Sequence, residues 1–451
     1  MSVKSLDPGI RRDDGEMINQ GLLKGILLMV LLLVARPGMT ALTIEITKGM
    51  EGAIPIAVVP FGWSGAAAGA PENIAAIIAS DLSRSGRFEP LADRDLVSHP
   101  TEASQVQFHN WRMLNVDNLV IGQVRETGPQ QYSIQFQLFD VFRTRQMIGY
   151  SFPAGKSELR RVAHHISDLI YEQLTGEKGA FNTQIAYITT AGSGKKKSYT
   201  LLVADSDGYN PQTILTSSQP LMSPAWSSDG NQVAYVSFEK KTAEIYIQSV
   251  ATGTRRKVAS FPGINGAPAW SPDGKRIALT LSRDGNPEIY LMTLSSKSLK
   301  RLTNSPAIDT EPVWTPDGRS IVFTSDRGGS PQLYQVSAGG GSAKRLTFDG
   351  KYNAGADISP DGKKIAMVHG ANGAYRIAVL DRETGLLRVL TDGKLDESPS
   401  FSPNGSMIIY ATDAGNRGVL AAVSVDGRFR QRLSLQAGNV REPVWSPFGR
   451  H

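Results

Sequence analysis

The feature that most constrains this chain is a motif that recurs six times along its second half. The strings SPAWSSDG, APAWSPDG and EPVWTPDG are followed by GADISPDG, SPSFSPNG and EPVWSPFG. Successive motifs are 43 or 44 residues apart, measured between the anchor residues Trp226, Trp270, Trp314, Ile358, Phe401 and Trp445. A repeat of this length is typical of the blades of a β-propeller.

Each repeat contains four segments with the composition of short strands. An anchor strand ends in an Asp-Gly or Asn-Gly turn, two apolar strands follow, and a short, more charged strand comes last. Asp-Gly and Asn-Gly are strong hairpin signals, and charge on an outer strand protects its open edge from aggregation. We interpret the motif as structural, with the anchor filling the space between blades.

Incomplete repeats at the two ends of this region complete each other. Trp445 has no strands after it, whereas Gln184–Ala191, Tyr199–Asp205 and Gln212–Ser217 are three strands that lack an anchor strand. The sequence therefore predicts an all-β, six-bladed propeller over residues 179–451, with the C-terminal strand closing the ring.

Residues 42–178 do not repeat and predict a small α/β domain. A helix is expected between Pro71, near its first turn, and Gly86 as its stop, because apolar residues follow helical spacing there. A second helix is expected from a cap at Ser157 to Thr175, followed by Gly176. Strand patterns cover residues 54–61, 118–124 and 132–141.

Residues 1–41 are predicted to be a cleaved export signal. Gly25–Val34 is an apolar run of ten residues, too short to cross a bilayer but suited to the core of a signal peptide. Lys24 flanks the run, and cleavage is expected after Met39-Thr40-Ala41. The acidic stretch before Met17 is unlike a signal, so Met17 makes a better start. An uncleaved buried helix or membrane anchor is the alternative.

Composition and motif spacing speak against an enzyme. The chain has no cysteine, its six histidines lack metal-ligand spacing, and it contains no G-x-S-x-G elbow. We interpret the Gly192–Lys195 and Asp205–Gly208 segments as turns, and we expect His164 and His165 at a helix surface. The formal charge of +6 is spread along the chain, which argues against nucleic-acid binding. No catalytic residue, metal or cofactor is predicted.

The loops that lead into the anchor strands are the candidate binding surface. They carry Asn265-Gly266-Ala267, Asp309-Thr310-Glu311, Tyr352-Asn353-Ala354, Asp396-Glu397-Ser398 and Val440-Arg441-Glu442. These loops vary while the strands repeat, as expected where a fixed scaffold presents a specific surface. Their acids would attract a basic partner or a cation; the alternative is that they are ordinary polar loop residues.

With these features together, the chain resembles the TolB family of periplasmic Tol-Pal components. The resemblance is carried by the export signal, by TIEITKGMEGAIPIAVVPF at the start of the α/β domain, and by the six repeats, with NGAPAWSPDG at Asn265–Gly274. It covers essentially the whole mature chain. The sequence departs from the family's pattern at Ile358, where the anchor is not aromatic, and at Phe448, where the last motif lacks its Asp.

The resemblance implies a monomeric, non-enzymatic interaction hub that supports the outer membrane and its constriction during cell division. The propeller mouth would bind the peptidoglycan-associated lipoprotein, and the segment after the cleavage site would bind TolA, with the two sites coupled. The implied mouth residues are Asn265, Ala267, Asp309, Thr310, Glu311, Asn353, Asp396, Glu397 and Glu442. The implied TolA segment is Leu42, Thr43, Ile44, Glu45, Ile46 and Thr47.

Two rival functions remain open. A propeller-based hydrolase would need a further catalytic domain with a serine elbow, and a carbohydrate or cell-wall binding protein would expose aromatic residues at the mouth. The tryptophans of this chain repeat instead at anchor positions that are expected to be buried.

Overall fold

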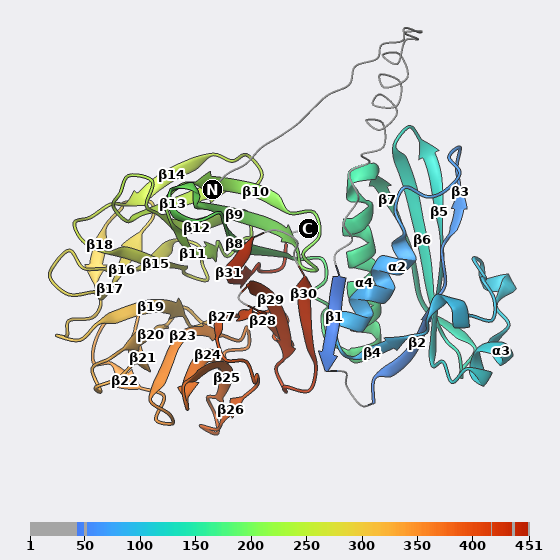
Figure 1. Cartoon of the computed structure of the whole chain (residues 1–451). Coiled ribbons are helices and arrows are strands. Elements are labelled where there is room, and N and C mark those ends of the chain that lie inside the picture. Colours follow the sequence, from blue (N-terminus) through green and yellow to red (C-terminus); the bar gives the residue numbers. More distant parts are fainter. Residues whose placement is uncertain (1–42, 49–51, 416, 435–437, 450–451) are drawn as a thin grey trace, which may run out of the picture. The chain divides into compact units, whose positions relative to one another are not determined.

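The structure is a computed structural model that describes residues 43–48, 52–415, 417–434 and 438–449 (Figure 1). The expected export signal, Met17, the cleavage site and Leu42 lie outside the described residues. Residues 42–451 form one compact unit. Within the described ranges, none of the helices combines the length and the apolar character needed to cross a membrane.

The α/β domain is built on a mixed sheet with the strand order β4-β2-β5-β6-β7, and β3 pairs with β5 (Figure 1). Its strands are β2 (Ile54–Val58), β3 (Gly62–Ser64), β4 (Phe88–Pro90), β5 (Asn118–Gly128), β6 (Gln131–Asp140) and β7 (Arg145–Gly155). Its helices are α2 (Ile74–Arg84), α3 (Phe108–Met113) and α4 (Leu159–Thr175), with short 3-10 turns at 93–95, 103–105 and 156–158. The apolar faces of α2 and α4 pack on the sheet in one core.

Both expected helices exist, but their first residues differ from the prediction. The side chain of Asn73 caps α2 by accepting a hydrogen bond from the Ala76 N–H at 3.1 Å, so α2 begins at Ile74, and Pro71 lies two residues before the cap. Ser157 is not the cap of α4, because it lies inside a 3-10 turn where Glu158 accepts from the Gly155 N–H at 3.0 Å. Gly176 ends α4 in the left-handed conformation, as predicted.

The propeller has six four-stranded antiparallel blades among the described residues, which confirms the predicted fold. Blade 1 consists of β8 (Gln184–Ala191), β9 (Ser198–Asp205), β10 (Gln212–Ser217) and the C-terminal β31 (Asn439–Trp445). Blade 2 consists of β11 (Leu221–Trp226), β12 (Gln232–Ser237), β13 (Glu244–Ser249) and β14 (Arg255–Ala259). Blade 3 consists of β15 (Asn265–Trp270), β16 (Arg276–Leu281), β17 (Glu288–Thr293) and β18 (Leu299–Arg301).

The remaining blades follow the same order. Blade 4 consists of β19 (Asp309–Trp314), β20 (Ser320–Ser325), β21 (Gln332–Ser337) and β22 (Lys344–Arg345). Blade 5 consists of β23 (Tyr352–Ile358), β24 (Lys364–Ala371), β25 (Ala374–Asp381) and β26 (Leu387–Val389). Blade 6 consists of β27 (Asp396–Phe401), β28 (Met407–Asp413), β29 (Gly418–Ser424) and β30 (Arg430–Ser434). The predicted closure is present, since β31 pairs antiparallel with β8.

The anchor residues join neighbouring blades. The indole Nε1 of Trp226 donates to the Val444 carbonyl and that of Trp314 to the Ala269 carbonyl, each at 3.1 Å and each across a blade boundary. These side chains are 7% and 5% exposed. The repeated tryptophans are therefore parts of the scaffold, as the motif predicted.

The segment before the α/β sheet joins the propeller instead. Strand β1 (Thr43–Lys48) pairs antiparallel with β30, the outer strand of blade 6, from Thr43 opposite Ser434 to Lys48 opposite Arg430. Blade 6 is thereby extended to five strands. The chain that begins on the propeller then enters the α/β domain at β2.

Candidate functional site

The six inner strands of the propeller share a kink at their third or fourth residue. Each kinked residue has a positive φ, between 43° and 62°, and five of the six precede a proline. The six residues, which we call the channel ring, are Ser223, Ala267, Glu311, Gly355, Ser398 and Glu442. In every inner strand the pairing register shifts at this point, as in a β-bulge.

The channel ring stores backbone strain at a defined place. A left-handed residue other than glycine costs of order 1–3 kcal/mol, and such strain clusters at functional sites because the surrounding fold must hold it. Only the blade 5 position is occupied by a glycine, Gly355. Five of the six positions therefore hold a costly conformation at one level of the channel, which makes the ring a candidate functional feature.

The ring borders a cavity of about 850 Å³ that runs along the propeller channel. Residues of all six inner strands line this cavity, including the prolines that follow the ring. A volume of this size is typical of binding pockets. The channel is therefore the main candidate site in the described part of the chain.

Two ring glutamates connect adjacent blades. Glu311 Oε2 accepts hydrogen bonds from the Thr324 hydroxyl at 2.8 Å and from the Gly355 N–H of the next blade at 2.9 Å. Glu442 accepts in the same way from the Ser223 N–H. Desolvation in the channel, reinforced by the charges of Glu397 and Glu311, raises the pKa of Glu442 to about 7. The negative charge of the channel therefore changes near neutral pH.

Four of the sequence-predicted mouth residues are buried in the propeller wall. Asn265, Asp309 and Asp396 each begin an inner strand, Asn353 is the second residue of β23, and each of the four is at most 1% exposed. Asp309 accepts two hydrogen bonds from Arg327, at 2.9 and 2.7 Å. The structure thus shows these side chains bonded within the protein, where they hold the loops that enter the channel.

The other buried members make comparable contacts. Asn265 bonds the backbone of Phe261 in both directions, at 2.9 and 2.7 Å. Asn353 donates to the Asp349 carbonyl at 2.7 Å, and Asp396 accepts from the Thr391 hydroxyl at 2.5 Å. These contacts tie each inner strand to the loop before it.

Of the five remaining predicted residues, Ala267, Glu311, Glu397 and Glu442 line the channel cavity, whereas Thr310 is not among its lining residues. Ala267, Thr310 and Glu442 are partly exposed, and Glu311 is exposed. Glu397 is partly exposed and accepts a hydrogen bond from Arg441 at 3.1 Å. These residues are the accessible members of the predicted set.

A group of exposed apolar side chains surrounds the mouth and was not predicted. Ile264, Ile308 and Leu395 immediately precede the buried first residues of three inner strands, and they are 48%, 50% and 37% exposed. Phe348 and Tyr375, 72% and 41% exposed, lie in the connection before β23 and at the start of β25. We call these five residues the apolar rim. For Ile264, Ile308 and Leu395 the sequence signal is an apolar residue directly before Asn265, Asp309 or Asp396.

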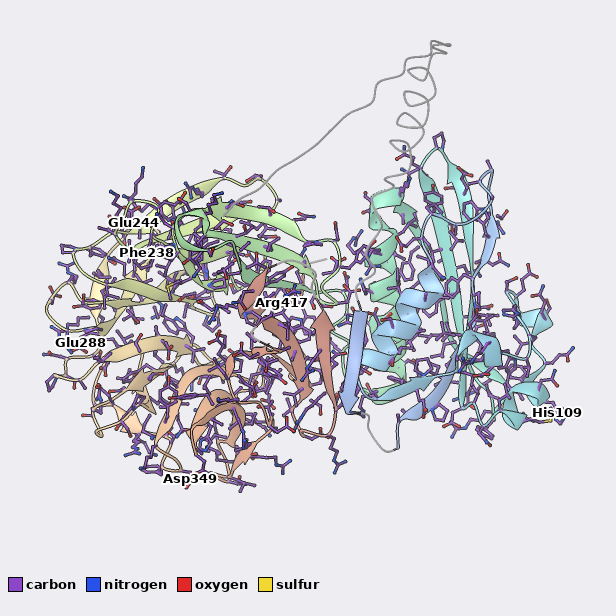
Figure 2. All side chains as sticks on the ribbon, viewed as in Figure 1. His109, Phe238, Glu244, Glu288, Asp349 and Arg417 are labelled. Carbon is purple, nitrogen blue, oxygen red and sulfur yellow. The ribbon has the colours of Figure 1, made fainter. Side chains whose placement is uncertain are left out.

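The outer strands carry basic residues that are partly neutralised within their own blades. Lys257 donates to Glu244 at 2.8 Å and Arg301 to Glu288 at 2.9 Å; Figure 2 labels both acids. Arg430 on β30 pairs with Asp392 at 2.7 Å. Positive charge on this surface is therefore distributed and paired, in contrast to a continuous nucleic-acid footprint.

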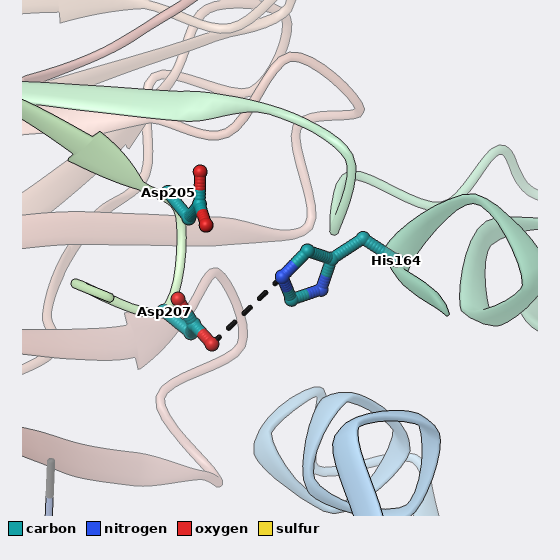
Figure 3. Close-up of side chains that lie close together, drawn as sticks. All are labelled: His164, Asp205 and Asp207. Carbon is teal, nitrogen blue, oxygen red and sulfur yellow. Dashed lines mark ion pairs between the residues drawn. The ribbon is translucent and has the colours of Figure 1, made fainter. Parts of the chain in front are cut away.

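One further cluster lies where the α/β domain contacts blade 1. His164, Asp205 and Asp207 each place one polar atom within 4.8 Å of the others (Figure 3). The expectation that His164 lies at a helix surface is wrong, because its side chain is 2% exposed and bonds Asp81. The apolar periodicity of α4 could not reveal this, since the covering group comes from the propeller. The Asp205–Gly208 segment is a turn, as predicted.

Comparisons with known proteins agree with this architecture. Residues 171–449 match the TolB beta propeller domain, and residues 42–147 match the TolB amino-terminal domain. The chain belongs to the TolB family. The TolB relatives include the Tol-Pal system protein TolB of Thioalkalivibrio sulfidiphilus, which is 64% identical over 423 residues, or 94% of this chain and 97% of the relative.

Two more relatives support the TolB assignment along nearly the full length. The Tol-Pal system protein TolB of Nitrosococcus oceani is 63% identical over 94% of this chain and 98% of its own length. The crystal structure of TolB from Acinetobacter baumannii matches with a TM-score of 0.83 and 45% identity, over 90% of this chain and all of that chain. These TolB relatives are named as components of the Tol-Pal system and not as enzymes.

Proposed function

We propose that this chain is a non-enzymatic interaction hub of the Tol-Pal system in the periplasm, exported by a cleaved signal in residues 1–41. It binds the peptidoglycan-associated lipoprotein at the propeller mouth and TolA through residues 42–47. By linking these partners it supports the integrity of the outer membrane and its constriction during cell division. It acts as a monomer, without nucleic acid, cofactor or membrane span.

The observation that carries the mouth assignment is the combination of accessible acids and exposed apolar side chains around one rigid ring. Protein-binding surfaces are centred on apolar and aromatic anchors with polar groups around them. The mouth provides Phe348 and Ile308 as anchors, with Glu311 and Glu397 as polar groups. In this proposal, buried Asn265, Asp309, Asn353 and Asp396 position the loops, and the accessible residues contact the lipoprotein.

The mouth assignment is tested by calorimetry with the purified lipoprotein domain. The double variant Thr310→Arg, Glu311→Lys reverses charge and adds bulk at the mouth, so we expect binding at least tenfold weaker. Leu386→Asp, which changes an exposed residue of the β25–β26 turn, is the matched control and should bind normally. Unaltered binding by the double variant, with the control also normal, would refute the mouth assignment.

The N-terminal assignment is supported by the position of β1 on an edge strand. Adding a strand to an exposed edge is a recurring mode of peptide recognition, and it is reversible because few contacts beyond the sheet ladder must break. A segment held this way on β30 can be exchanged for a partner. Deleting residues 42–50 should abolish TolA binding and leave the circular dichroism of the propeller unchanged. Retained TolA binding would refute this half of the proposal.

A carbohydrate ligand is the second candidate, favoured by one observation. The apolar rim exposes the rings of Phe348 and Tyr375 beside the mouth, and aromatic faces at a mouth are what a sugar-binding module requires. Sedimentation with purified peptidoglycan distinguishes the two. Binding that is lost in Tyr375→Ala, in the absence of any lipoprotein, would favour the carbohydrate function.

A further inference from the structure

Six charged or titratable side chains meet where the α/β domain contacts the propeller. Helix α2 contributes Asp81 and Arg84, and helix α4 contributes Arg160 and His164. The last residue of β9 is Asp205, and the turn after it contributes Asp207. We call this set the interdomain cluster. Arg84 reaches the Ser206 hydroxyl of blade 1 at 2.8 Å, and Arg160 reaches Asp207 at 2.6 Å. Both contacts cross between the two domains.

His164 stands at the centre of this set with one ring nitrogen unsatisfied. Its Nδ1 lies 2.7 Å from Asp81 Oδ2, whereas its Nε2 lies 3.9 Å from Asp207 Oδ2 and has no hydrogen-bond partner. Asp81 accepts a hydrogen bond from Nδ1, so a neutral His164 ring would carry its single proton on Nδ1. The lone pair of Nε2 would then face the carboxylate of Asp207. That arrangement is repulsive, and a proton on Nε2 makes it attractive.

The net charge of the neighbouring side chains also favours a protonated, positively charged His164. Asp81, Asp205 and Asp207 bring three carboxylates, and Arg84 and Arg160 bring two guanidinium groups. Glu72 on the segment before α2, 3.8 Å from Arg160, adds a further negative charge. Asp168 on α4 accepts from the Phe181 and Asn182 N–H groups, and burial raises its pKa to about 7. A charged His164 brings the cluster closest to neutrality.

A metal ion is not needed to supply this charge. The guanidinium of Arg160 donates to Asp207 Oδ2, lies 3.6 Å from Asp205 Oδ2, and is stacked 3.7 Å above the Tyr209 ring. A divalent ion between His164 and these acids would have to share its space with that fixed cation. The geometry therefore favours a proton over a metal.

We propose that protonated His164 is the central cation of a latch that holds the α/β domain against blade 1, and that the latch is released when His164 loses its proton. Burial opposes the charge, but Asp81 and Asp207 outweigh it and raise the pKa of His164 above its usual 6.5. A group whose pKa is raised on folding stabilises the folded arrangement below its unfolded pKa, and this stabilisation is lost as pH rises through the folded pKa. The latch is thus closed in mild acid and weakened in mild alkali.

The absence of cysteine allows a direct measurement on the full mature chain. Spin labels at Met113→Cys and Leu386→Cys, which are 65% and 59% exposed, report one distance between the α/β domain and the propeller. We expect a narrow distance distribution at about pH 5.5 that broadens at least twofold by about pH 8.5. In His164→Asn, which keeps a donor for Asp81 but cannot charge, the broad distribution should be present at both pH values.

His165→Asn is the matched control on the same helix, since the His165 ring contacts Phe152 of the α/β sheet, and it should keep the pH response. A wild-type distribution that does not change with pH, or a response retained in His164→Asn, would overturn the proposal. Broadening caused by a chelator at pH 5.5 would also overturn it, because a metal would then hold the interface.

A measurement on the unmodified chain removes any dependence on variant folding. The chain has six histidines, so the nitrogen shifts of His164 can be assigned in the labelled wild-type protein. We expect an imidazolium at pH 6.5 with a titration midpoint above that value. A neutral His164 at pH 6.5 would refute the latch, whatever the behaviour of the variants.

Discussion

Two blades of the propeller receive strands from opposite ends of the chain, and the two additions differ in what holds them. Strand β31 becomes the inner strand of blade 1, where Trp445 is 8% exposed and its Nε1 donates to Thr183 at 2.8 Å. Strand β1 is added to the outer edge of blade 6, which already has four strands. Strand β31 completes both blade 1 and the ring, whereas β1 extends a blade that already has its four strands.

This difference indicates which addition can be reversible. Removing β31 would take the inner strand from blade 1, interrupt the channel ring at Glu442, and open the propeller at an apolar boundary. Removing β1 would only expose the edge of β30, in the same way that the outer strands of other blades are edges. We therefore expect the fold to survive the loss of the outer strand at blade 6, but not of the inner strand at blade 1.

The largest expected effect on stability is at β31, the strand that closes the ring in blade 1. Trp445→Ala should lower the free energy of unfolding by about 3–5 kcal/mol, because it leaves a cavity and removes the bond to Thr183. Trp270→Ala is the control, since Trp270 is only half-buried and its Nε1 has no hydrogen-bond partner. Denaturant unfolding should show a clearly smaller loss for the control. Equal losses would mean that closure gives Trp445 no special role.

The next effect is the pH dependence contributed by Glu442 of β31. Its carboxyl has a pKa of about 7 in the folded chain because it is desolvated and faces other acids. Stability should therefore fall as pH rises from about 4.5 to 7, by about 3 kcal/mol for this group. Glu442→Gln stays neutral and should flatten this part of the profile in thermal unfolding. A profile unchanged by the substitution would contradict the assigned pKa.

A smaller effect is expected at the apolar rim that the inner strands support. Phe348→Asp should weaken lipoprotein binding about tenfold, or ~1.4 kcal/mol, because it replaces an exposed anchor with a charge. The melting temperature should not change, since the ring is 72% exposed. Calorimetric titration and a thermal melt check both halves. Normal binding with an unchanged melt would place the lipoprotein elsewhere.

The smallest stability effect is expected at the outer addition. Deleting residues 42–50 should lower the free energy of unfolding by less than about 1 kcal/mol, because a terminal edge strand contributes little to a complete sheet. Amides of β30 should exchange faster with solvent, while those of β28 and β29 should not. A loss of stability as large as that of Trp445→Ala would contradict the proposed difference between β31 and β1.

The scaffold was predictable because its information is local and repeated. A 43- or 44-residue period, Asp-Gly turns and strand-length apolar segments predicted the blades, and two incomplete repeats predicted the closure through β31. The caps were less predictable: the side chain of Asn73 caps α2, and Ser157 lies inside a 3-10 turn before α4. The pairing of β1 with β30 joins residues far apart in the chain, and no local pattern encodes it.

The candidate site was likewise predictable only in part. The variable loops before the anchors suggested where a mouth would lie, but they could not distinguish buried Asp309 from exposed Glu311 two residues later. That distinction comes from the bulge at the channel ring, which changes the direction of successive side chains, and from Arg327, which bonds Asp309 from the turn after β20. The exposure of Phe348 and Ile308 likewise depends on where the loops before β23 and β19 end.

By itself the sequence determined the number of blades, the position of the anchors and the way the ring closes, because hydrophobic period and turn chemistry act between neighbours in the chain. Only the tertiary structure decided which polar residues face the channel and where β1 pairs. It also decided that His164 is surrounded by carboxylates. Burial and charge environment depend on groups brought together from distant parts of the chain. Asp81 of α2 meets His164 when the α/β domain folds, and Asp207 faces His164 only once the two domains have packed.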